Sequence, residues 1–289
     1  MLPSRFEYHR ASSIEEALAL LDRYGEDAKL LAGGQSLIPL LKLRFAAPEH
    51  LIDLNPIADL GAISERDGVL RIGALTRHND LIRSEVIARG YPVIAAAAPQ
   101  IADPLVRNLG TIGGSLAHAD PAGDLGAVML AMGASVLLRS SDGERAVGID
   151  EFLVDTFTTT MTPNEVLTEV HVPTPAARSG GAYLKLERKV GDFATVGVAV
   201  QVEMANGTIG RAGIALTGVG SKNIQASGAE EALAGAEPTD DAFAEAGRLA
   251  AAACNPVSDV RGSAEYKRHM VEVYVKRGLA RAVESARAA

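Results

Sequence analysis

The chain of 289 residues carries a net charge of −8 and is 47% hydrophobic, a composition typical of a globular protein with room for two or three domains. Its single cysteine, Cys254, excludes an intramolecular disulfide, a cysteine-bound iron–sulfur cluster within this chain, and a cysteine-rich zinc site. The acidic balance argues against nucleic-acid binding. No apolar run reaches the roughly 18 residues of a membrane helix, and the first residues do not resemble a signal peptide, so we expect a cytoplasmic protein.

Residues 1–56 begin with a helix and continue as strand, loop, helix and strand. Ser12 and Glu15 have the spacing of a capping box, and Gly25 is a typical helix end. Apolar spacing predicts a helix between these signals, then a strand over 28–32, a helix over 37–44 and a strand over 50–54. The strand over 28–32 runs directly into a pair of glycines.

Residues 57–176 form a second mixed segment. The predicted elements are a strand over 69–75, one helix over 77–89 capped by Thr76, a helix over 91–100, a glycine-rich loop over 107–124, a helix over 124–132 and strands over 134–139 and 166–172.

Residues 177–289 do not alternate between helices and strands as the preceding segments do. Long strand-like runs come first and helices follow. Strands are predicted over 182–188, 193–204 and 208–217, and helices from about 228, over 240–253 and over 263–285. Asn206-Gly207 between the last two strands is a strong hairpin signal. We therefore predict an α+β protein, with two α/β subdomains (1–56 and 57–176) and a C-terminal domain of antiparallel sheet plus helices (177–289).

Two segments of similar pattern are candidates for chemistry. We call residues 32–36 (Ala-Gly-Gly-Gln-Ser) the first glycine motif and residues 111–115 (Thr-Ile-Gly-Gly-Ser) the second glycine motif. Glycine lets an anion approach the main-chain N–H groups, and serine adds a hydroxyl donor, so the two motifs could hold a pyrophosphate from both sides. Asp124 could accept hydrogen bonds from ligand hydroxyls. Neither motif matches the glycine patterns of Rossmann or P-loop proteins.

Simpler structural interpretations stand beside these. Glycine pairs are common in turns. The charged residues from Lys185 to Lys189 alternate as on a solvated strand face, Phe193 is most simply a core aromatic, and Cys254 a small core residue. No two of the six histidines have metal-ligand spacing, so we predict no metal site.

Several segments in a fixed order carry the pattern of a known family. They are Phe6 to Arg10, Leu31 to Ser36, Pro48 to Leu54, Val106 to Ser115, Asp120 to Asp124, Lys185 to Ala194 and Asp259 to Arg268. In these segments the chain resembles the FAD-binding medium subunit of molybdenum hydroxylases of the xanthine oxidase superfamily, in the form found in carbon monoxide dehydrogenase. The resemblance covers nearly the whole length.

The resemblance implies a fold, a cofactor and a set of binding residues. The first 176 residues would form a PCMH-type FAD-binding fold, and FAD would lie between its subdomains. Its pyrophosphate would lie on Ala32, Gly33, Gly34, Gln35, Ser36, Thr111, Ile112, Gly113, Gly114 and Ser115, and Leu31 would be a further cofactor-binding residue. Asp124 and Lys185 would lie near the flavin's polar chain and ring, and Ile101, Asp192 and Phe193 would approach the isoalloxazine. The resemblance implies no catalytic residue in this chain.

The resemblance also implies partners. A large subunit would oxidise the substrate at a molybdenum–molybdopterin cytosine dinucleotide, a small subunit would carry two [2Fe–2S] clusters, and the three would assemble as a dimer of heterotrimers. This chain would then pass electrons through FAD to an external acceptor. Gln35, Ser115 and Phe193 depart from the family pattern, so an N-heterocycle or aldehyde hydroxylase remains an alternative. A self-contained flavin oxidoreductase and a non-catalytic nucleotide-binding module are two further alternatives.

Overall fold

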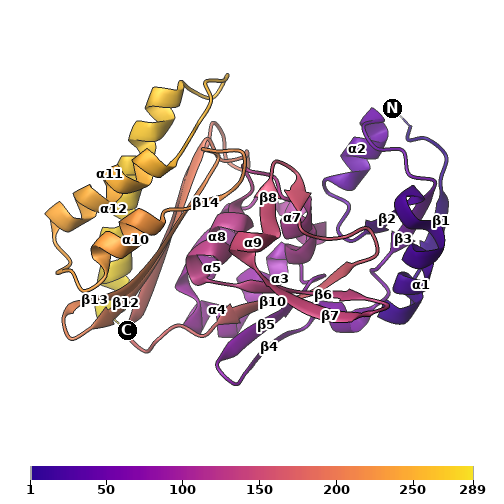
Figure 1. The fold of residues 1–289 in the computed structure, drawn as a ribbon, viewed down its shortest axis with the longest axis horizontal. Coiled ribbons are helices and arrows are strands. Elements are labelled where there is room, and N and C mark those ends of the chain that lie inside the picture. Colours follow the sequence, from indigo (N-terminus) through magenta and orange to yellow (C-terminus); the bar gives the residue numbers. More distant parts are fainter. Residues whose placement is uncertain (1, 289) are drawn as a thin grey trace.

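The computed structural model describes residues 2–288 and is built around three main sheets that follow one another along the chain (Figure 1). The first is a parallel sheet of order β1-β3-β2, made of β1 (Glu7–Arg10), β2 (Ala28–Leu31) and β3 (His50–Asp53). Its helices are α1 (Ile14–Tyr24), the 3₁₀ turn η1 (Gly25–Asp27) and α2 (Leu37–Leu43).

The start of α1 lies one residue later than the sequence predicted. Ser13, not Ser12, is the N-cap, and its hydroxyl accepts from the N–H of Glu16. Glu16 in turn accepts from the N–H of Ser12 at 2.8 Å, so a reciprocal pair of bonds still satisfies the helix start. The predicted end at Gly25 is confirmed.

The second sheet is antiparallel, with order β4-β5-β10-β6-β7. Its strands are β4 (Ile63–Arg66), β5 (Val69–Gly73), β6 (Ser135–Ser140), β7 (Gly143–Gly148) and β10 (Val166–Pro173). The connections hold η2 (Ala58–Gly61), α3 (His78–Arg83), α4 (Glu85–Gly90), α5 (Pro92–Ala97), η3 (Ala98–Gln100), α6 (Pro104–Leu109), α7 (Ile112–His118), α8 (Asp124–Met132), α9 (Ile149–Phe152) and the short pair β8 (Leu153–Asp155) and β9 (Thr158–Thr159).

Three predictions for this part were wrong. The single helix over 77–89 is two helices, because Ser84 is extended and its hydroxyl caps α4 by accepting from the N–H of Ile87. Arg77, not Thr76, is the N-cap residue of α3. The predicted loop over 107–124 contains α7 and the end of α6, so the second glycine motif begins a helix.

The third sheet is antiparallel, with order β11-β12-β13-β14. Its strands are β11 (Ser179–Leu186), β12 (Val196–Ala205), β13 (Thr208–Thr217) and β14 (Ile224–Gln225), followed by α10 (Ser227–Leu233), α11 (Asp240–Ala253) and α12 (Ala264–Ala288). Asn206 and Gly207 have φ of 51° and 88°, as expected for the predicted hairpin turn.

The third sheet is covered on both faces. Helices α10 and α12 pack on one side, with α11 packed against both of them, and α5 and α8 of the preceding segment pack on the other (Figure 1). Residues 196–202 of β12 and all of α8 are therefore buried, which explains why both read as continuous apolar runs. This mixed architecture confirms the predicted α+β class. We propose domain boundaries after residues 56 and 176. No helix within residues 2–288 is both long and apolar enough to cross a bilayer.

Candidate functional site

A cavity of about 960 Å³ is lined by residues from all three predicted segments. The lining includes most of the sequence-predicted binding residues: Ala32, Gly33, Gly34, Gln35, Ser36, Ile101, Thr111, Gly113, Gly114, Ser115, Asp124, Asp192 and Phe193. The fold thus brings together segments that lie up to about 160 residues apart in the sequence.

Three predicted residues do not line this cavity. Leu31 belongs to β2, where it pairs with Asp53. Ile112 is fully buried in the core below the second sheet. Lys185 lies behind Asp124, and only 1% of its side chain is exposed. These residues can support the wall of the cavity but do not form its surface.

The first glycine motif connects β2 to α2 and carries free hydrogen-bond donors. Within residues 2–288, no group accepts from the backbone N–H of Gly33, Gly34, Gln35 or Ser36. Gly34 has a φ of +72°, a conformation that favours glycine. Consecutive free N–H groups at a tight turn are a typical anion-binding arrangement.

The second glycine motif forms the first turn of α7, and unlike the first motif it has most of its backbone N–H groups already bonded. Thr111 is the N-cap, and its hydroxyl accepts from the N–H of Gly114 at 3.1 Å. The N–H groups of Ile112 and Gly113 donate to the carbonyls of Thr76 and Ala74. The prediction that this motif offers a free backbone loop is therefore wrong. It presents side chains and the positive end of a helix instead.

Two serine hydroxyls complete the polar side of the cavity. Ser36 and Ser115 both line it, and neither side chain has a hydrogen-bond partner within residues 2–288. Together with the N–H groups of the first motif, they give a set of neutral donors from two elements. Such donors suit the oxygens of a phosphate or pyrophosphate.

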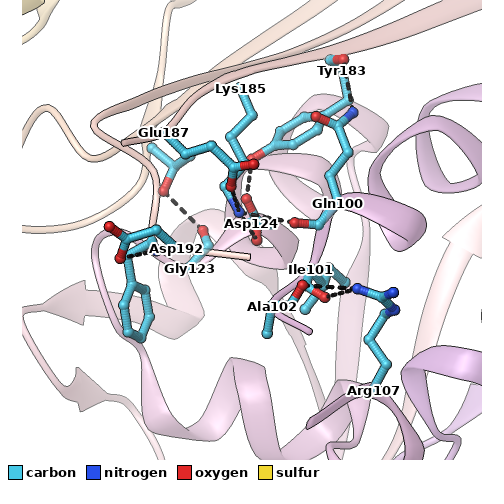
Figure 2. Close-up of polar contacts among 12 residues, drawn as sticks. Gln100, Ile101, Ala102, Arg107, Gly123, Asp124, Tyr183, Lys185, Glu187 and Asp192 are labelled. Carbon is cyan, nitrogen blue, oxygen red and sulfur yellow. Dashed lines mark hydrogen bonds and ion pairs between the residues drawn. The ribbon is translucent and has the colours of Figure 1, made fainter. Parts of the chain in front are cut away.

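Asp124 lies at the first position of α8, in a buried polar cluster (Figure 2). The Lys185 ammonium donates to its carboxylate at 3.1 Å and to the carbonyl of Gln100 at 2.9 Å. The Tyr183 hydroxyl donates to the other carboxylate oxygen of Asp124, and Glu187 lies 3.4 Å from the ammonium. The expectation that Lys185 lies on a solvated face was wrong.

Burial governs the ionisation of this cluster. Desolvation raises the pKa of Asp124, although Lys185 and Tyr183 oppose that shift. Desolvation and the neighbouring carboxylate raise the pKa of Tyr183 well above its usual value, so its hydroxyl stays a donor. One edge of Asp124 lines the cavity while its oxygens are fixed from behind.

The far wall of the cavity is apolar and more open. Ile101 is 8% exposed, whereas Phe193 is 51% exposed, so the expectation that Phe193 is a core aromatic was wrong. The loop that carries Phe193 is fixed by Arg261, which donates to the Phe193 carbonyl at 2.7 Å and to the Asp192 carboxylate at 3.0 Å. A planar apolar group fits between such surfaces.

Sequence reasoning missed two residues at this site. Arg107 donates to the carbonyls of Ile101 and Ala102 at 2.7 and 2.8 Å and holds that turn against the cavity (Figure 2). His78 lines the cavity, is almost fully buried, and its Nδ1 has no partner within residues 2–288. Arg107 was part of a quoted family segment, but no local pattern pointed to His78.

Comparison with known proteins gives a consistent result over nearly the whole chain. Residues 4–175 match the family model of the FAD-binding domain in molybdopterin dehydrogenase. Residues 181–282 match that of the carbon monoxide dehydrogenase flavoprotein C-terminal domain.

Full-length relatives agree with these models. The carbon monoxide dehydrogenase medium chain of Hydrogenophaga pseudoflava is 46% identical over 96% of this chain and 97% of its own length. The 6-hydroxypseudooxynicotine dehydrogenase complex subunit alpha of Paenarthrobacter nicotinovorans is 42% identical over 99% and 97%. The structure of the Hydrogenophaga carbon monoxide dehydrogenase, which lacks the Mo-pyranopterin moiety, matches with a TM-score of 0.96 at 48% identity over 99% of both chains. The chain therefore belongs to the family of FAD-binding medium subunits of molybdenum hydroxylases, and it is an oxidoreductase subunit with FAD as its cofactor.

The residues of the cavity fit FAD. The volume of the cavity lies near the upper end of the roughly 300–1,000 Å³ typical of ligand sites, as an extended dinucleotide requires. Free N–H and hydroxyl donors suit the pyrophosphate, a fixed carboxylate suits the polar chain, and the apolar wall suits the ring.

Proposed function

We propose that this chain is the electron-transfer subunit of a heterotrimeric molybdenum hydroxylase of the carbon monoxide dehydrogenase type. The observation that carries the proposal is the identity of 46–48% with the carbon monoxide dehydrogenase of Hydrogenophaga pseudoflava over nearly the full length. Bound FAD would supply the redox chemistry that links [2Fe–2S] clusters of a partner to an external acceptor.

This chain's own residues bind and orient the cofactor. Gly33 to Ser36 and Ser115 hold the pyrophosphate, and Asp124 accepts from hydroxyls of the polar chain. Ile101 and Phe193, which line the cavity, would offer apolar surface to the ring. Lys185 is a positioning residue, because it acts through Asp124 and the Gln100 carbonyl.

Two features support partner subunits. Cys254 is the only cysteine, so clusters bound by cysteine must belong to other chains. Beside Phe193, the loop residues Val190 and Val260 are 95% and 88% exposed, and exposed apolar side chains next to a redox site favour a protein contact. We propose a large molybdenum–molybdopterin cytosine dinucleotide subunit and a small [2Fe–2S] subunit, assembled as a dimer of heterotrimers. The cytoplasm stays our predicted location.

A second candidate function, hydroxylation of a substrate other than carbon monoxide, is supported by two relatives. The relative named for a 6-hydroxypseudooxynicotine dehydrogenase is nearly as similar, at 42%. The quinoline 2-oxidoreductase of Pseudomonas putida 86 matches with a TM-score of 0.93 at 32% identity over 99% of both chains. An N-heterocycle or aldehyde substrate is therefore the alternative to carbon monoxide.

The experiment is to purify the native complex and assay carbon monoxide, aldehydes and N-heterocycles with an artificial electron acceptor. The proposal expects three kinds of subunit, one FAD per copy of this chain and turnover of carbon monoxide. Turnover of a heterocycle or aldehyde alone would move the assignment to the alternative. Substrate turnover by this chain without partners would contradict the electron-transfer role.

A further inference from the structure

Three potential metal ligands share one face of the first sheet, away from the FAD cavity. Glu7 and His9 are two residues apart on β1, so their side chains point to the same face of the strand. The parallel register pairs Glu7 with His50 on β3. A glutamate and two histidines are thereby neighbours, although 41 residues separate the histidines.

The distances are close to those of a tetrahedral metal site. His9 Nε2 lies 3.0 Å from His50 Nδ1, and the Glu7 carboxylate lies 3.6 Å from His50 Nδ1 and 4.0 Å from His9 Nε2. Ligand atoms bound at about 2.0–2.1 Å to a tetrahedral ion are about 3.3 Å apart. The largest change needed is about 0.7 Å, between Glu7 and His9. The Glu7 side chain is 73% exposed, so it is free to move by this amount.

The two imidazoles are held in place before any ion arrives. The ring of Tyr24, at the end of α1, stacks on His50 with centroids 3.7 Å apart and on His9 at 5.1 Å. The side chains of His9 and His50 are only 21% and 14% exposed. A hydrogen bond between the imidazoles explains their pairing, but it does not explain the carboxylate that faces the same two nitrogens.

We propose that Glu7, His9 and His50 bind one divalent transition-metal ion, with Zn²⁺ as the best match. Two imidazoles and one carboxylate suit zinc, whereas Mg²⁺ and Ca²⁺ prefer oxygen ligands throughout. Three protein ligands leave the fourth position open toward solvent. The ion ties β1 to β3. The spacing of these residues along the sequence gives no sign of a metal site, because only the strand register brings the three side chains together.

The test uses the tag-free, FAD-loaded full-length chain and Zn²⁺ alone, titrated in competition with a chromophoric chelator. We expect one Zn²⁺ per chain, at least tenfold weaker binding in His9→Gln, His50→Gln and Glu7→Gln, and a Co²⁺ absorption spectrum of tetrahedral type. His171→Gln is the matched control, because His171 lies 2.5 Å from Glu169 and no third potential ligand joins them within residues 2–288.

Circular dichroism and FAD content check that each variant is folded. Glu7→Gln, at a mostly exposed position, keeps the test valid if a histidine variant does not fold. Absence of saturable binding in the unsubstituted chain would overturn the proposal. Equal Zn²⁺ affinity in the unsubstituted chain and all folded variants would overturn it as well. Neither outcome bears on the proposed FAD function.

Discussion

The four glycines of the two motifs serve different purposes. A Cβ on Gly33 would overlap the Leu109 carbonyl, and one on Gly113 would meet Ala74, so these two allow close packing of the chain on itself. Gly34 supplies the positive φ. A Cβ on Gly114 would meet only the Thr111 hydroxyl and, at 3.7 Å, the Ala32 methyl, both of which belong to the cavity wall. Gly114 is therefore the position where a side chain most directly affects a ligand.

We predict that Gly114→Val abolishes FAD retention in a protein that still folds. The added methyl groups displace the Thr111 cap and enter the space beside the first motif, at a cost of about 1 kcal/mol for the lost cap. The measurement is FAD released on denaturation, per chain. Gly228→Val is the control, because nothing lies within 4 Å of a Cβ there. Stoichiometric FAD in folded Gly114→Val would count against the assigned site.

His78 is predicted to make stability fall as the solution becomes acidic. Burial, with Arg107 and Arg77 nearby, lowers the pKa of His78 from 6.5 to about 4. Between pH 6.5 and pH 4 the unfolded chain binds a proton at His78 that the folded chain does not bind. The contribution of neutral His78 to the free energy of unfolding is therefore complete above pH 6.5 and is lost as the pH falls toward 4. From pH 7 to pH 5 the loss from this group is about 2 kcal/mol.

Urea unfolding at pH 7 and pH 5 checks this expectation. The free energy of unfolding should fall less in His78→Gln than in the unsubstituted chain, by roughly the 2 kcal/mol assigned to the histidine. Parallel pH dependences in the two proteins would show that His78 is not the responsible group.

At the scale of elements, the sequence predicted those whose signals are local. The helix over 240–253 and the hairpin at Asn206-Gly207 match the structure because capping, periodicity and turn residues all lie within the segment. The break at Ser84 was missed because serine is tolerated in either a helix or a cap. The second glycine motif is helical because Thr111 caps it and Ala74 and Thr76 accept from its N–H groups, which are tertiary contacts.

The sequence predicted most of the residues that line the cavity, but not how each of them is placed. The cavity brings both motifs together with Asp124 and Phe193, as expected from the family pattern. Lys185 was placed on a solvated face because charge alternation along a strand does not reveal that Gln100 of η3 and Asp124 of α8 lie against it. His78 carries no local signal, because its importance depends on the two arginines and the glycine packed around it.

Arg107 is predicted to control FAD affinity through the turn at Ile101 and Ala102. Ala102 has a φ of +44°, which is unfavourable for alanine, and Arg107 holds its carbonyl. Arg107→Met should weaken FAD binding by about tenfold, in line with about 1.4 kcal/mol for charge-assisted bonds. FAD fluorescence titration measures this effect. The exposed Arg66→Met is the control, and equal affinities in both variants would rule out the role.

Lys185 and Asp124 are predicted to be strongly coupled. Removing one member of a buried pair leaves an uncompensated charge, so Lys185→Met should destabilise the chain by about 3 kcal/mol. The double variant Asp124→Asn, Lys185→Met should recover part of this loss, because the remaining amide is neutral. Urea unfolding of the four proteins gives the coupling free energy. Additive losses would contradict a direct interaction.

At the scale of the whole molecule, segments attached to all three sheets together line the cavity. The first sheet contributes the loop with free N–H donors, the second contributes α7 and α8, and the third contributes the loop with Phe193. Lys185 of the third sheet holds Asp124 from behind. The single cysteine, Cys254, is too few to hold a cysteine-bound cluster, and the loop residues Val190 and Val260 are strongly exposed. This arrangement suits a chain that holds a flavin at the edge of a larger assembly.

The most direct test is anaerobic addition of carbon monoxide to the purified complex while the flavin absorption is followed. The account predicts that the FAD of every copy of this chain is reduced, and that it is reoxidised when an acceptor is added. A complex that oxidises carbon monoxide while its flavin stays oxidised, or that contains no FAD, would contradict the central claim.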